Sequence, residues 1–449
     1  MTAIQKKKHI SSFQIIILGF LGLVLLGSLF LMLPISSAEG QWTSFKDAAF
    51  TATSAVCVTG LIVKDTATYW SMFGQMVIIT LIQIGGMGVV TVSLCVVMLS
   101  GKKIGLMQRS TMQESISAPQ VGGIVKLTRF ILKGMFLIEG IGAVCLYPVF
   151  MKEFGWLKGI WYSVFHSISS FCNAGFDLMG VKSPFSSLTS YVGHAWINIV
   201  FCTLIVVGGI GFLVWHDVIT HKWHFHKYRM QSKVALLTSL VLIVLPAVYF
   251  YLGEFQSSAW SDLSSSEKIW ASLFQSVTTR TAGMNTVDFN SLTDSGKLIS
   301  IFLMLIGGSP GSTAGGMKTT TLMVLIFSAI AVFRRQEEAQ CFGRRIDNDV
   351  VRNAAAILMM YLMLFMTGSV IISAIEGISI LTCMFECASA VGTVGLTLGI
   401  TTELSTVSHI LLMCMMFIGR VGGMTLVFAI MPGDKNKNAK YPLEKITVG

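Results

Sequence analysis

Long apolar runs alternate with shorter polar segments along the whole chain, and the runs come in pairs. Each pair encloses a segment rich in glycine and hydroxyl residues, shorter than the roughly 20 residues that a helix needs to cross a bilayer. The pattern predicts four units, at 1–100, 101–220, 221–335 and 336–430, followed by a tail at 431–449. The expected paired spans are 13–33 and 70–98, 128–150 and 191–219, 231–252 and 297–333, and 352–375 and 404–430.

The enclosed segments repeat one pattern. Their expected bounds are 45–60, 160–175, 268–283 and 380–395, and they end on Gly60, Gly175, Gly283 and Gly395. A phenylalanine stands ten residues before three of these glycines, whereas the third copy has Leu273 there and Phe274 one step later. Because self-similarity recurs at a period of about 110 residues, the chain is built from internal repeats.

A second mark lies in the second span of each unit. It reads IGGMG from Ile84, VGGIG from Val207, IGGSPG from Ile306 and IGRVGG from Ile418. The third copy continues as IGGSPGSTAGGMKTT, whose glycines and proline cannot stay in a regular helix, so we expect a break at 306–318. In the other units the glycine pairs have two interpretations, close packing of small residues between helices and a role at a central site.

Composition and charge place the chain in a membrane. It is 53% hydrophobic and 12% charged, against about 25% charged residues in soluble domains. We therefore expect an all-α polytopic membrane protein without a sizeable soluble domain, and any soluble regulator must be a separate chain. The apolar run from Phe13 to Leu33 lacks a clean cleavage site and is expected to be a retained first span.

Most of the 32 lysines and arginines lie between units rather than within them. The clusters are Lys6 to Lys8, Lys102 to Lys133, Lys222 to Lys233, Arg334 to Arg352 and Lys435 to Lys445. By the positive-inside rule these segments and both termini are cytoplasmic. The enclosed segments then dip in from outside and return, so four parallel repeats of span, pore loop and span surround a pseudo-fourfold central pore. The net charge of the chain is +10, and this distribution of basic residues indicates contact with membrane headgroups rather than with nucleic acid.

Re-entrant backbone at membrane depth is tolerated where it is buried in protein or lines a water-filled cavity. Short helices in the loops would direct their negative carboxyl ends inward, which favours a cation. The extended backbone after each helix can present carbonyl oxygens that replace the hydration shell of the ion. The loops therefore predict a cation pore.

These features resemble the Ktr/Trk/HKT superfamily of potassium transporters over the whole chain, with SAVCVTGL and AVGTVGL as examples of the loops. In particular, the chain is similar to the membrane subunits of bacterial Ktr uptake systems. The resemblance implies potassium uptake across the plasma membrane, with potassium bound in a selectivity filter, and Gly60 in place of serine implies potassium rather than sodium transport. The implied filter residues are Val56, Cys57, Val58, Thr59, Gly60, Phe171, Cys172, Asn173, Ala174, Gly175, Thr279, Arg280, Thr281, Ala282, Gly283, Val391, Gly392, Thr393, Val394 and Gly395.

The resemblance also implies an intramembrane gate. Its residues are Gly307, Gly308, Ser309, Pro310, Gly311, Ser312, Thr313, Ala314, Gly315, Gly316, Lys318 and Arg420. Arg420 replaces a glycine of the second mark in the fourth unit, and a charge within the membrane usually faces the interior or a partner. We expect Arg420 to donate hydrogen bonds to carbonyls or hydroxyls of the loop.

The implied partners are a second copy of the chain, membrane lipids and a cytoplasmic KtrA-like regulatory ring that binds ATP or ADP and docks on the basic loops. No cofactor is expected in this chain, and sodium is a candidate activator of uptake.

Alternatives remain at this stage. A sodium- or proton-coupled symporter would use Glu139 or Glu386 as its coupling site, although Glu386 is also expected as a buried structural acceptor. A membrane-embedded enzyme needs a cluster of His, Asp or Ser at useful spacing, which the spans lack, so no enzyme is expected. The segment from Gly311 departs from a phosphate-binding loop because Met317 separates the last glycine from Lys318. Arg280 would repel cations on the axis, so we expect it to point behind the filter.

Overall fold

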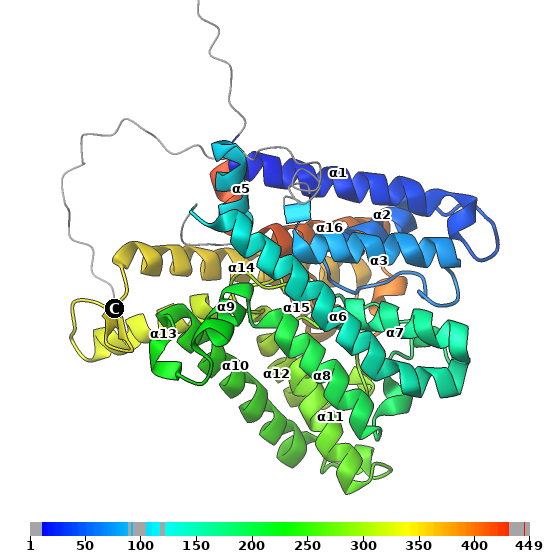
Figure 1. Ribbon diagram of the computed structural model, residues 1–449. Coiled ribbons are helices and arrows are strands. Elements are labelled where there is room, and N and C mark those ends of the chain that lie inside the picture. Colours follow the sequence, from blue (N-terminus) through cyan, green and yellow to red (C-terminus); the bar gives the residue numbers. More distant parts are fainter. Residues whose placement is uncertain (1–10, 89–90, 93–104, 117–121, 431–443, 445–449) are drawn as a thin grey trace, which may run out of the picture.

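The computed structural model describes residues 11–88, 91–92, 105–116, 122–430 and 444 of the chain (Figure 1). The predictions for the Lys6 to Lys8 cluster, for the end of the span at 70–98 and for nearly all of the tail lie outside these residues. The described part is mostly helical. Its only strands are β1 (Gln340–Cys341) and β2 (Arg344–Arg345), which form a short antiparallel hairpin.

The helices follow the four predicted units. The first contains α1 (Ser12–Met32), α2 (Phe45–Val56) and α3 (Met72–Met87), and α5 (Leu106–Ile116) follows. The second contains α6 (Ile124–Phe154), α7 (Trp156–Phe171), α8 (Ala195–Gly209) and α9 (Phe212–His221). The third contains α10 (Met230–Tyr249), the π turn η5 (Phe250–Glu254), α11 (Ser265–Thr278), α12 (Asp294–Leu305) and α13 (Thr319–Phe333). The fourth contains α14 (Asn348–Glu376), α15 (Ile380–Gly392), α16 (Thr406–Val421) and α17 (Gly423–Ile430).

Single 3-10 turns complete the connections. They are η1 (Pro34–Ser36), η2 (Met179–Val181), η3 (Thr189–Tyr191), η4 (Phe225–Lys227), η6 (Ser258–Trp260), η7 (Phe289–Ser291) and η8 (Ile400–Thr402).

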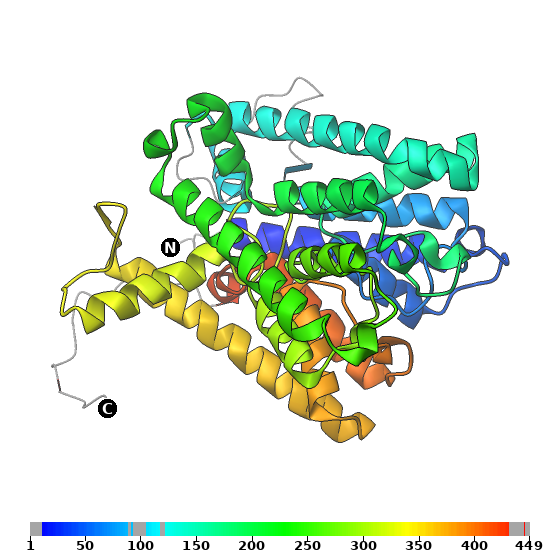
Figure 2. The same ribbon diagram turned by 90° about the horizontal axis from the view of Figure 1, so that it is seen from below.

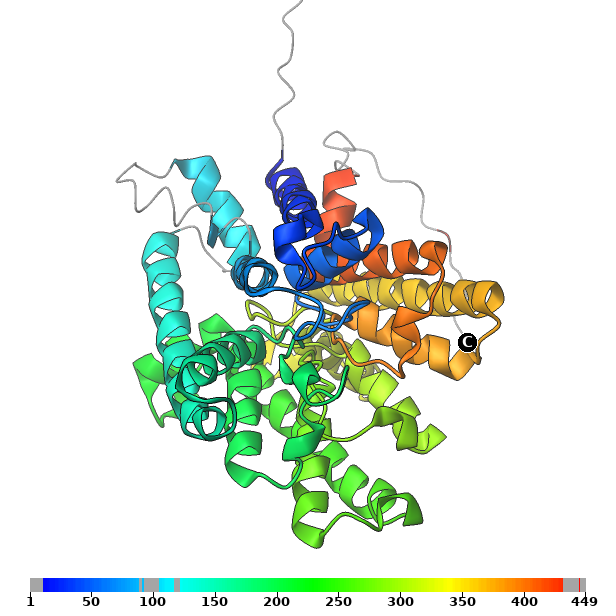
Figure 3. The same cartoon turned by 90° about the vertical axis from the view of Figure 1, so that its right-hand side faces the viewer.

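The units are arranged around a common centre. Seen from the side on which α2, α7 and α15 lie, the helices of the four units form four groups, and the loops that follow the short helices meet between them (Figure 3). Figure 2 shows that α13, the start of α14 and the β1–β2 hairpin extend away from the other helices. The outer faces are apolar: on α1, for example, Leu18 and Leu29 are each 57% exposed. Such a surface suits a lipid solvent and not water.

Four described helices are long and apolar enough to cross a membrane, judged by length and composition: α1, α6, α10 with η5, and α14. These are the first helices of the four units. The pair α8 and α9 qualifies as a fifth if it is counted as one span, but it bends by 98°.

The second spans differ from the expected continuous helices. We expected a break in the third unit alone, yet α3 ends before Gly88, α8 ends before the bend at Gly211, and α16 ends before Gly422. The φ angles of these glycines are 85°, 102° and 88°, a region that side chains with a Cβ atom rarely enter. The fifth residue of the second mark therefore interrupts the helix in the first, second and fourth units, and the 306–318 loop does so in the third.

Candidate functional site

The short helices α2, α7, α11 and α15 end at the molecular centre. Ser44 caps α2 by accepting a hydrogen bond from the Asp47 amide, and Ser264 caps α11 in a capping box with Glu267. The Ser264 amide hydrogen-bonds the Glu267 carboxylate and lowers the pKa of Glu267. These caps lie at the outer ends of the helices. The carboxyl ends, which carry partial negative charge, lead directly into the central segments, defined here as 56–60, 171–175, 279–283 and 391–395.

The four central segments share one backbone conformation. Their third residues, Val58, Asn173, Thr281 and Thr393, all have φ between 51° and 69°. Their last residues, the ring glycines Gly60, Gly175, Gly283 and Gly395, have φ between 72° and 97°. Two left-handed residues at the same two positions of every segment show that the units are equivalent at the level of the backbone.

A hydroxyl four residues after the phenylalanine of each short helix holds the segment that follows. Ser54 and Ser389 accept hydrogen bonds of 3.0 Å from the amides of Gly60 and Gly395. Ser169 donates to the Phe176 carbonyl at 2.6 Å, and Thr278 donates to the Met284 carbonyl. The third unit has one residue fewer between its phenylalanine and its ring glycine, which explains the displaced Phe274. Our sequence analysis missed these hydroxyls, although their constant distance from the phenylalanine was a usable signal.

The ring glycines bring the segments into direct contact. A Cβ atom on Gly60 would lie 2.6 Å from the Ala174 carbonyl oxygen, and one on Gly395 would lie 2.2 Å from the Thr59 oxygen. Likewise, a Cβ atom on Gly175 would lie 3.1 Å from the Ala282 oxygen, and one on Gly283 would lie 2.2 Å from the Val394 oxygen. Each ring glycine thus faces the fourth residue of a neighbouring segment, in the closed order 60, 175, 283, 395. The four segments surround one centre.

Backbone amides and carbonyls of the segments differ in their partners. The amides bond back to the short helices, as in Thr59 to Ser54 and Val394 to Ser389, both 2.8 Å. Within the described part of the chain, no hydrogen bond reaches the carbonyl oxygens of the fourth residues: Thr59, Ala174, Ala282 and Val394. These residues are at most 1% exposed. Because buried carbonyls are normally paired, four unpaired oxygens around one centre fit a cation as their ligand.

The glycine pairs of the second mark pack directly behind the central segments. A Cβ atom on Gly85, Gly208 or Gly419 would lie 2.1, 1.9 or 2.2 Å from the carbonyl oxygen of the first segment residue in its own unit. Those residues are Val56, Phe171 and Val391. Small-residue packing is therefore one role of the glycine pairs. The pairs pack against the central segments and not against a helix far from them.

The Gly-rich loop at 306–318 lies against the central segments of two other units. The Thr313 hydroxyl donates to the Phe171 carbonyl at 3.0 Å, and the Thr313 amide donates to the Gly208 carbonyl at 3.2 Å. The Gly316 amide donates to the Gly419 carbonyl at 3.2 Å. A Cβ atom on Gly315 would lie 2.1 Å from the Thr393 hydroxyl. The loop therefore sits between the second and fourth units, where it contacts the first residue of one central segment and the third residue of the other.

Two cations hold this loop. The Lys318 ammonium donates to the Ala314 carbonyl at 2.7 Å, which closes the loop on itself. Arg420 donates to the carbonyl of Thr313, as expected, and also to the carbonyls of Gly85 and Gly86, the latter at 3.1 Å. The contact with the first unit was not expected from the sequence. A cavity of about 280 Å³ adjoins these groups, lined by Arg420, Lys318, Gly88 and Tyr361 among others.

Three other charged residues are buried and hydrogen-bonded to protein groups. Arg280 turns back to α10 and donates to the Ser239 hydroxyl at 3.1 Å and to the Ser239 carbonyl at 3.4 Å. Glu386 on α15 accepts hydrogen bonds from Thr397, at 2.8 Å, and from Thr401. Glu139 on α6 accepts from Gln83 on α3 at 3.0 Å. Each has a protein partner, so the geometry gives all three a structural role.

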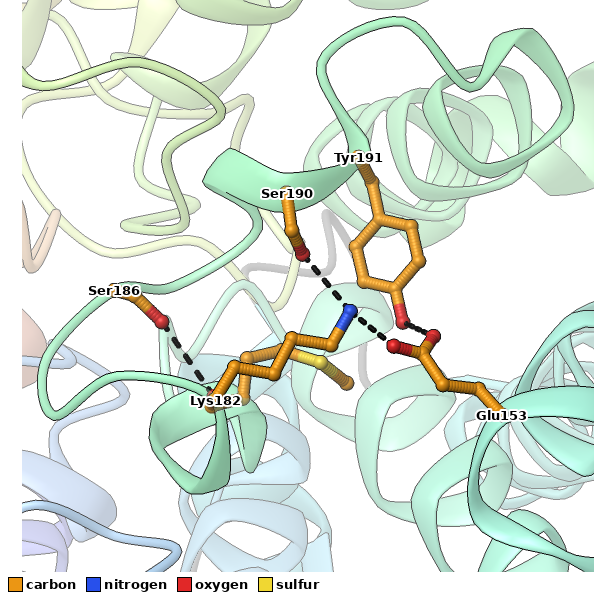
Figure 4. Close-up of polar contacts among 6 residues, drawn as sticks. Glu153, Lys182, Ser186, Ser190 and Tyr191 are labelled. Carbon is orange, nitrogen blue, oxygen red and sulfur yellow. Dashed lines mark hydrogen bonds and ion pairs between the residues drawn. The ribbon is translucent and has the colours of Figure 1, made fainter.

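On the side where the short helices begin, polar contacts fasten the return segment of the second unit (Figure 4). The Lys182 ammonium donates to Ser190 at 3.1 Å, pairs with Glu153 and lies 4.2 Å from the centroid of the Tyr191 ring. The Tyr191 hydroxyl donates to the same Glu153 carboxylate at the end of α6. The contacts anchor the segment that follows Gly175. Nearby, burial raises the pKa of Asp177 to about 6, although the Met179 amide hydrogen-bonds its carboxylate.

No group of three or more His, Cys, Asp or Glu side chains that could hold a metal ion occurs in the described ranges. In the basic segment 221–227, the ring nitrogens of His221 and His224 hydrogen-bond the backbone carbonyls of Asp217 and His221.

Apolar helices around four equivalent re-entrant segments define a helical membrane transporter. A family model described as "TrkH: Cation transport protein" matches residues 5–439, and the chain belongs to this family of cation transporters. The "Potassium/sodium uptake protein NtpJ" of Enterococcus hirae is 40% identical, with 100% of both chains covered. The "Ktr system potassium uptake protein B" of Bacillus subtilis is 38% identical over 97% of this chain and 96% of its own length.

A solved structure supports the fold. The potassium transporter TrkH from Vibrio parahaemolyticus superposes with a TM-score of 0.73 at 19% identity, covering 96% of this chain and 87% of that one. The architecture of a helical membrane transporter predicted from the sequence is confirmed. The relatives are cation transporters and not enzymes, in agreement with the prediction from the sequence.

Proposed function

We propose that the chain is a potassium uptake protein of the plasma membrane, in which potassium passes through the ring of the four central segments. The observation that carries the proposal is the set of buried, unpaired carbonyl oxygens at Thr59, Ala174, Ala282 and Val394. Main-chain oxygens at the negative ends of four helices replace water around a monovalent cation. The relatives named as a potassium/sodium and a potassium uptake protein, at 40% and 38% identity over almost the whole chain, support potassium as the ion.

The Gly-rich loop is the gate in this proposal. It lies against Phe171 and Thr393 of two central segments, and Lys318 and Arg420 fix its position. Loop displacement would free the path from the ring to the cavity beside Arg420. The ring glycines then select the ion and the loop controls its passage.

The orientation and the partners are part of the proposal. The basic segments between units, with both termini, are cytoplasmic, and the short helices enter from outside. The chain forms a homodimer, and a cytoplasmic KtrA-like ring that binds ATP or ADP regulates the gate. The name "Ktr system" of the relatives fits a transporter with several components. Sodium is the candidate activator.

Substitution of the ring glycines tests the filter. Gly60→Ser and Gly395→Ser each place a side chain against the neighbouring segment, at a φ of 95° or 97°. We expect each variant to lower the apparent potassium affinity by about tenfold or more, or to increase sodium uptake relative to potassium, a change of about 1.4 kcal/mol or more. The measurement is growth and ion uptake of a potassium-uptake-deficient bacterium at limiting potassium, with and without a regulatory partner.

Gly22→Ser is the matched control, because no atom lies within 4 Å of a Cβ atom on Gly22, which lies in α1. Its uptake should equal that of the unmodified protein. If both ring variants keep the original affinity and ion preference while their membrane levels are normal, the filter assignment is wrong.

A further inference from the structure

An apolar groove opens between α10, α13 and α14, on the side that we propose is cytoplasmic. Its volume is about 420 Å³, within the range of about 300–1,000 Å³ of small-molecule sites. Val234, Phe327, Val350 and Ile357 contribute to its walls, and Pro310 of the Gly-rich loop is part of its lining. The groove therefore reaches from the outer surface of these helices to the proposed gate.

A basic pocket adjoins this groove. Lys227, Arg229, Arg344 and Arg345 line it, and Met230 lines both the pocket and the groove. Arg229 pairs with Asp217 at 3.7 Å and Arg345 with Glu338 at 2.9 Å. Within the described residues, Lys227 and Arg344 have no ion-pair partner, so two cationic side chains at the groove mouth are available to an anion.

The two sides of the pocket are joined. The Lys233 ammonium lies 5.9 Å from the ring centroid of Phe225 on η4 and 5.6 Å from that of Phe342 in the β1–β2 hairpin. Large apolar side chains next to these elements face outward: Trp223 is 97% exposed and Phe333 is 83% exposed. Exposed aromatic residues beside basic ones are typical of the level of the lipid headgroups.

We propose that this groove and pocket form a binding site for an anionic phospholipid. One acyl chain occupies the groove against Val234 and Phe327, and the headgroup phosphate lies between Lys227 and Arg344. The charge complementarity and the shared lining residue Met230 favour a lipid over an apolar helix, which would leave the cations unpaired. Since the groove ends at Pro310, the bound chain supports the conformation of the Gly-rich loop seen here. This last consequence rests on the proposed function.

Lipid retention tests the site directly. The full-length protein is purified in detergent with phosphatidylglycerol or phosphatidylcholine, and bound lipid is counted by native mass spectrometry. We expect preferential retention of phosphatidylglycerol, reduced about thirtyfold in affinity by the double substitution Lys227→Gln and Arg344→Gln, which removes two cationic side chains from the headgroup site. Lys126→Gln with Arg129→Gln, two exposed basic residues of α6, is the matched control and should retain the lipid.

A second pair of variants tests the groove. Val350 lines it and is 47% exposed, so Val350→Trp should block the acyl chain, whereas Val370→Trp, at a 56% exposed position of the same helix, should not. Equal phosphatidylglycerol retention in all variants would overturn the proposal. So would loss of self-association in Val350→Trp without any loss of lipid, because a second copy of the chain would then cover the groove. Binding of ATP in lipid-free detergent that the double substitution abolishes would assign the pocket to a soluble phosphate and overturn it as well.

The link to the gate has its own measurement. Potassium flux into phosphatidylcholine vesicles reports the proposed function without the anionic lipid. Added phosphatidylglycerol should change this flux in the unmodified protein and not in the double variant. An absence of flux in every vesicle would contradict the proposed function alone, whereas flux that ignores phosphatidylglycerol despite its binding would overturn the coupling to the loop.

Discussion

Arg420 is the residue that connects three units at the proposed gate. From α16 of the fourth unit it reaches the Thr313 carbonyl in the third and the carbonyls of Gly85 and Gly86 in the first. Its planar guanidinium presents donors in two directions, which a lysine ammonium cannot match. Because hydrogen bonds to charged groups contribute about 1.5–3 kcal/mol, the loss of this side chain should loosen the loop substantially.

Arg420→Ala should therefore raise potassium flux in the absence of a regulator. We expect an increase of about tenfold, since 1.4 kcal/mol of lost stabilisation changes an equilibrium tenfold. The potassium flux of Arg420→Lys should lie between that of the unmodified protein and that of Arg420→Ala. Rubidium uptake into proteoliposomes measures the rate, and Arg352→Ala, at an exposed residue that pairs with Asp349, is the control. Deletion of 311–316 should raise the rate at least as much, and unchanged rates in both Arg420→Ala and the deletion would exclude the gate.

Sequence reasoning could identify the residues of the centre because their backbone demands are local. A left-handed φ and the contact with the next segment both require glycine at 60, 175, 283 and 395. The sequence therefore has a glycine at the same position of every repeat. The outward turn of Arg280 toward Ser239 on α10 followed from charge repulsion alone. The carbonyl partners of Arg420 at Gly85 and Gly86 are a different case, since they are 335 and 334 residues away and depend on how two units meet.

At the scale of elements, the interruption of all four second spans is the main addition to the sequence analysis. The signal was present, because Gly88, Gly211 and Gly422 stand at the same place in three copies of the second mark. Isolated glycines are tolerated in membrane helices, so composition alone did not require a break. In the second unit the Gly-rich loop of the third unit requires the break: the Ser309 amide donates to the Gly209 carbonyl at 2.9 Å, and the Phe212 amide donates to the Gly311 carbonyl at 2.7 Å. These partners exist because α8 ends there.

Gly422→Ala isolates the cost of this backbone conformation. The nearest atom to a Cβ atom on Gly422 is 3.8 Å away, so no clash is added, and the φ of 88° with ψ of 131° is accessible almost only to glycine. We expect a loss of about 1–3 kcal/mol in the free energy of unfolding. Thermal unfolding in detergent measures it. Gly140→Ala, within helix α6 and with no atom within 4 Å, should keep or slightly raise the midpoint. Equal midpoints for both variants would show that α16 and α17 can form one continuous helix.

At the scale of the whole molecule, the arrangement of the units followed from charge and repetition. Basic segments on both ends of every unit require the units to run parallel, and four parallel units with one re-entrant segment each can close around an axis. The contacts between units depend on side-chain shape over long sequence distances. For that reason the position of the Gly-rich loop between the second and fourth units, and the groove between α10, α13 and α14, needed the structure.

The closed ring and the partners of the buried acids predict passive permeation. The carboxylates of Glu139 and Glu386 already accept hydrogen bonds from Gln83 and from Thr397, so we expect neither to bind a second transported ion. In voltage-clamped giant vesicles, the reversal potential of the open variant lacking 311–316 should shift by about 59 mV for each tenfold change in the potassium gradient. It should stay constant when the sodium or proton gradient changes, and Glu139→Gln and Glu386→Gln should leave it unaltered. A reversal potential that follows sodium or protons at a fixed potassium gradient would instead establish a coupled symporter, and its loss in one of the two Gln variants would identify the coupling residue.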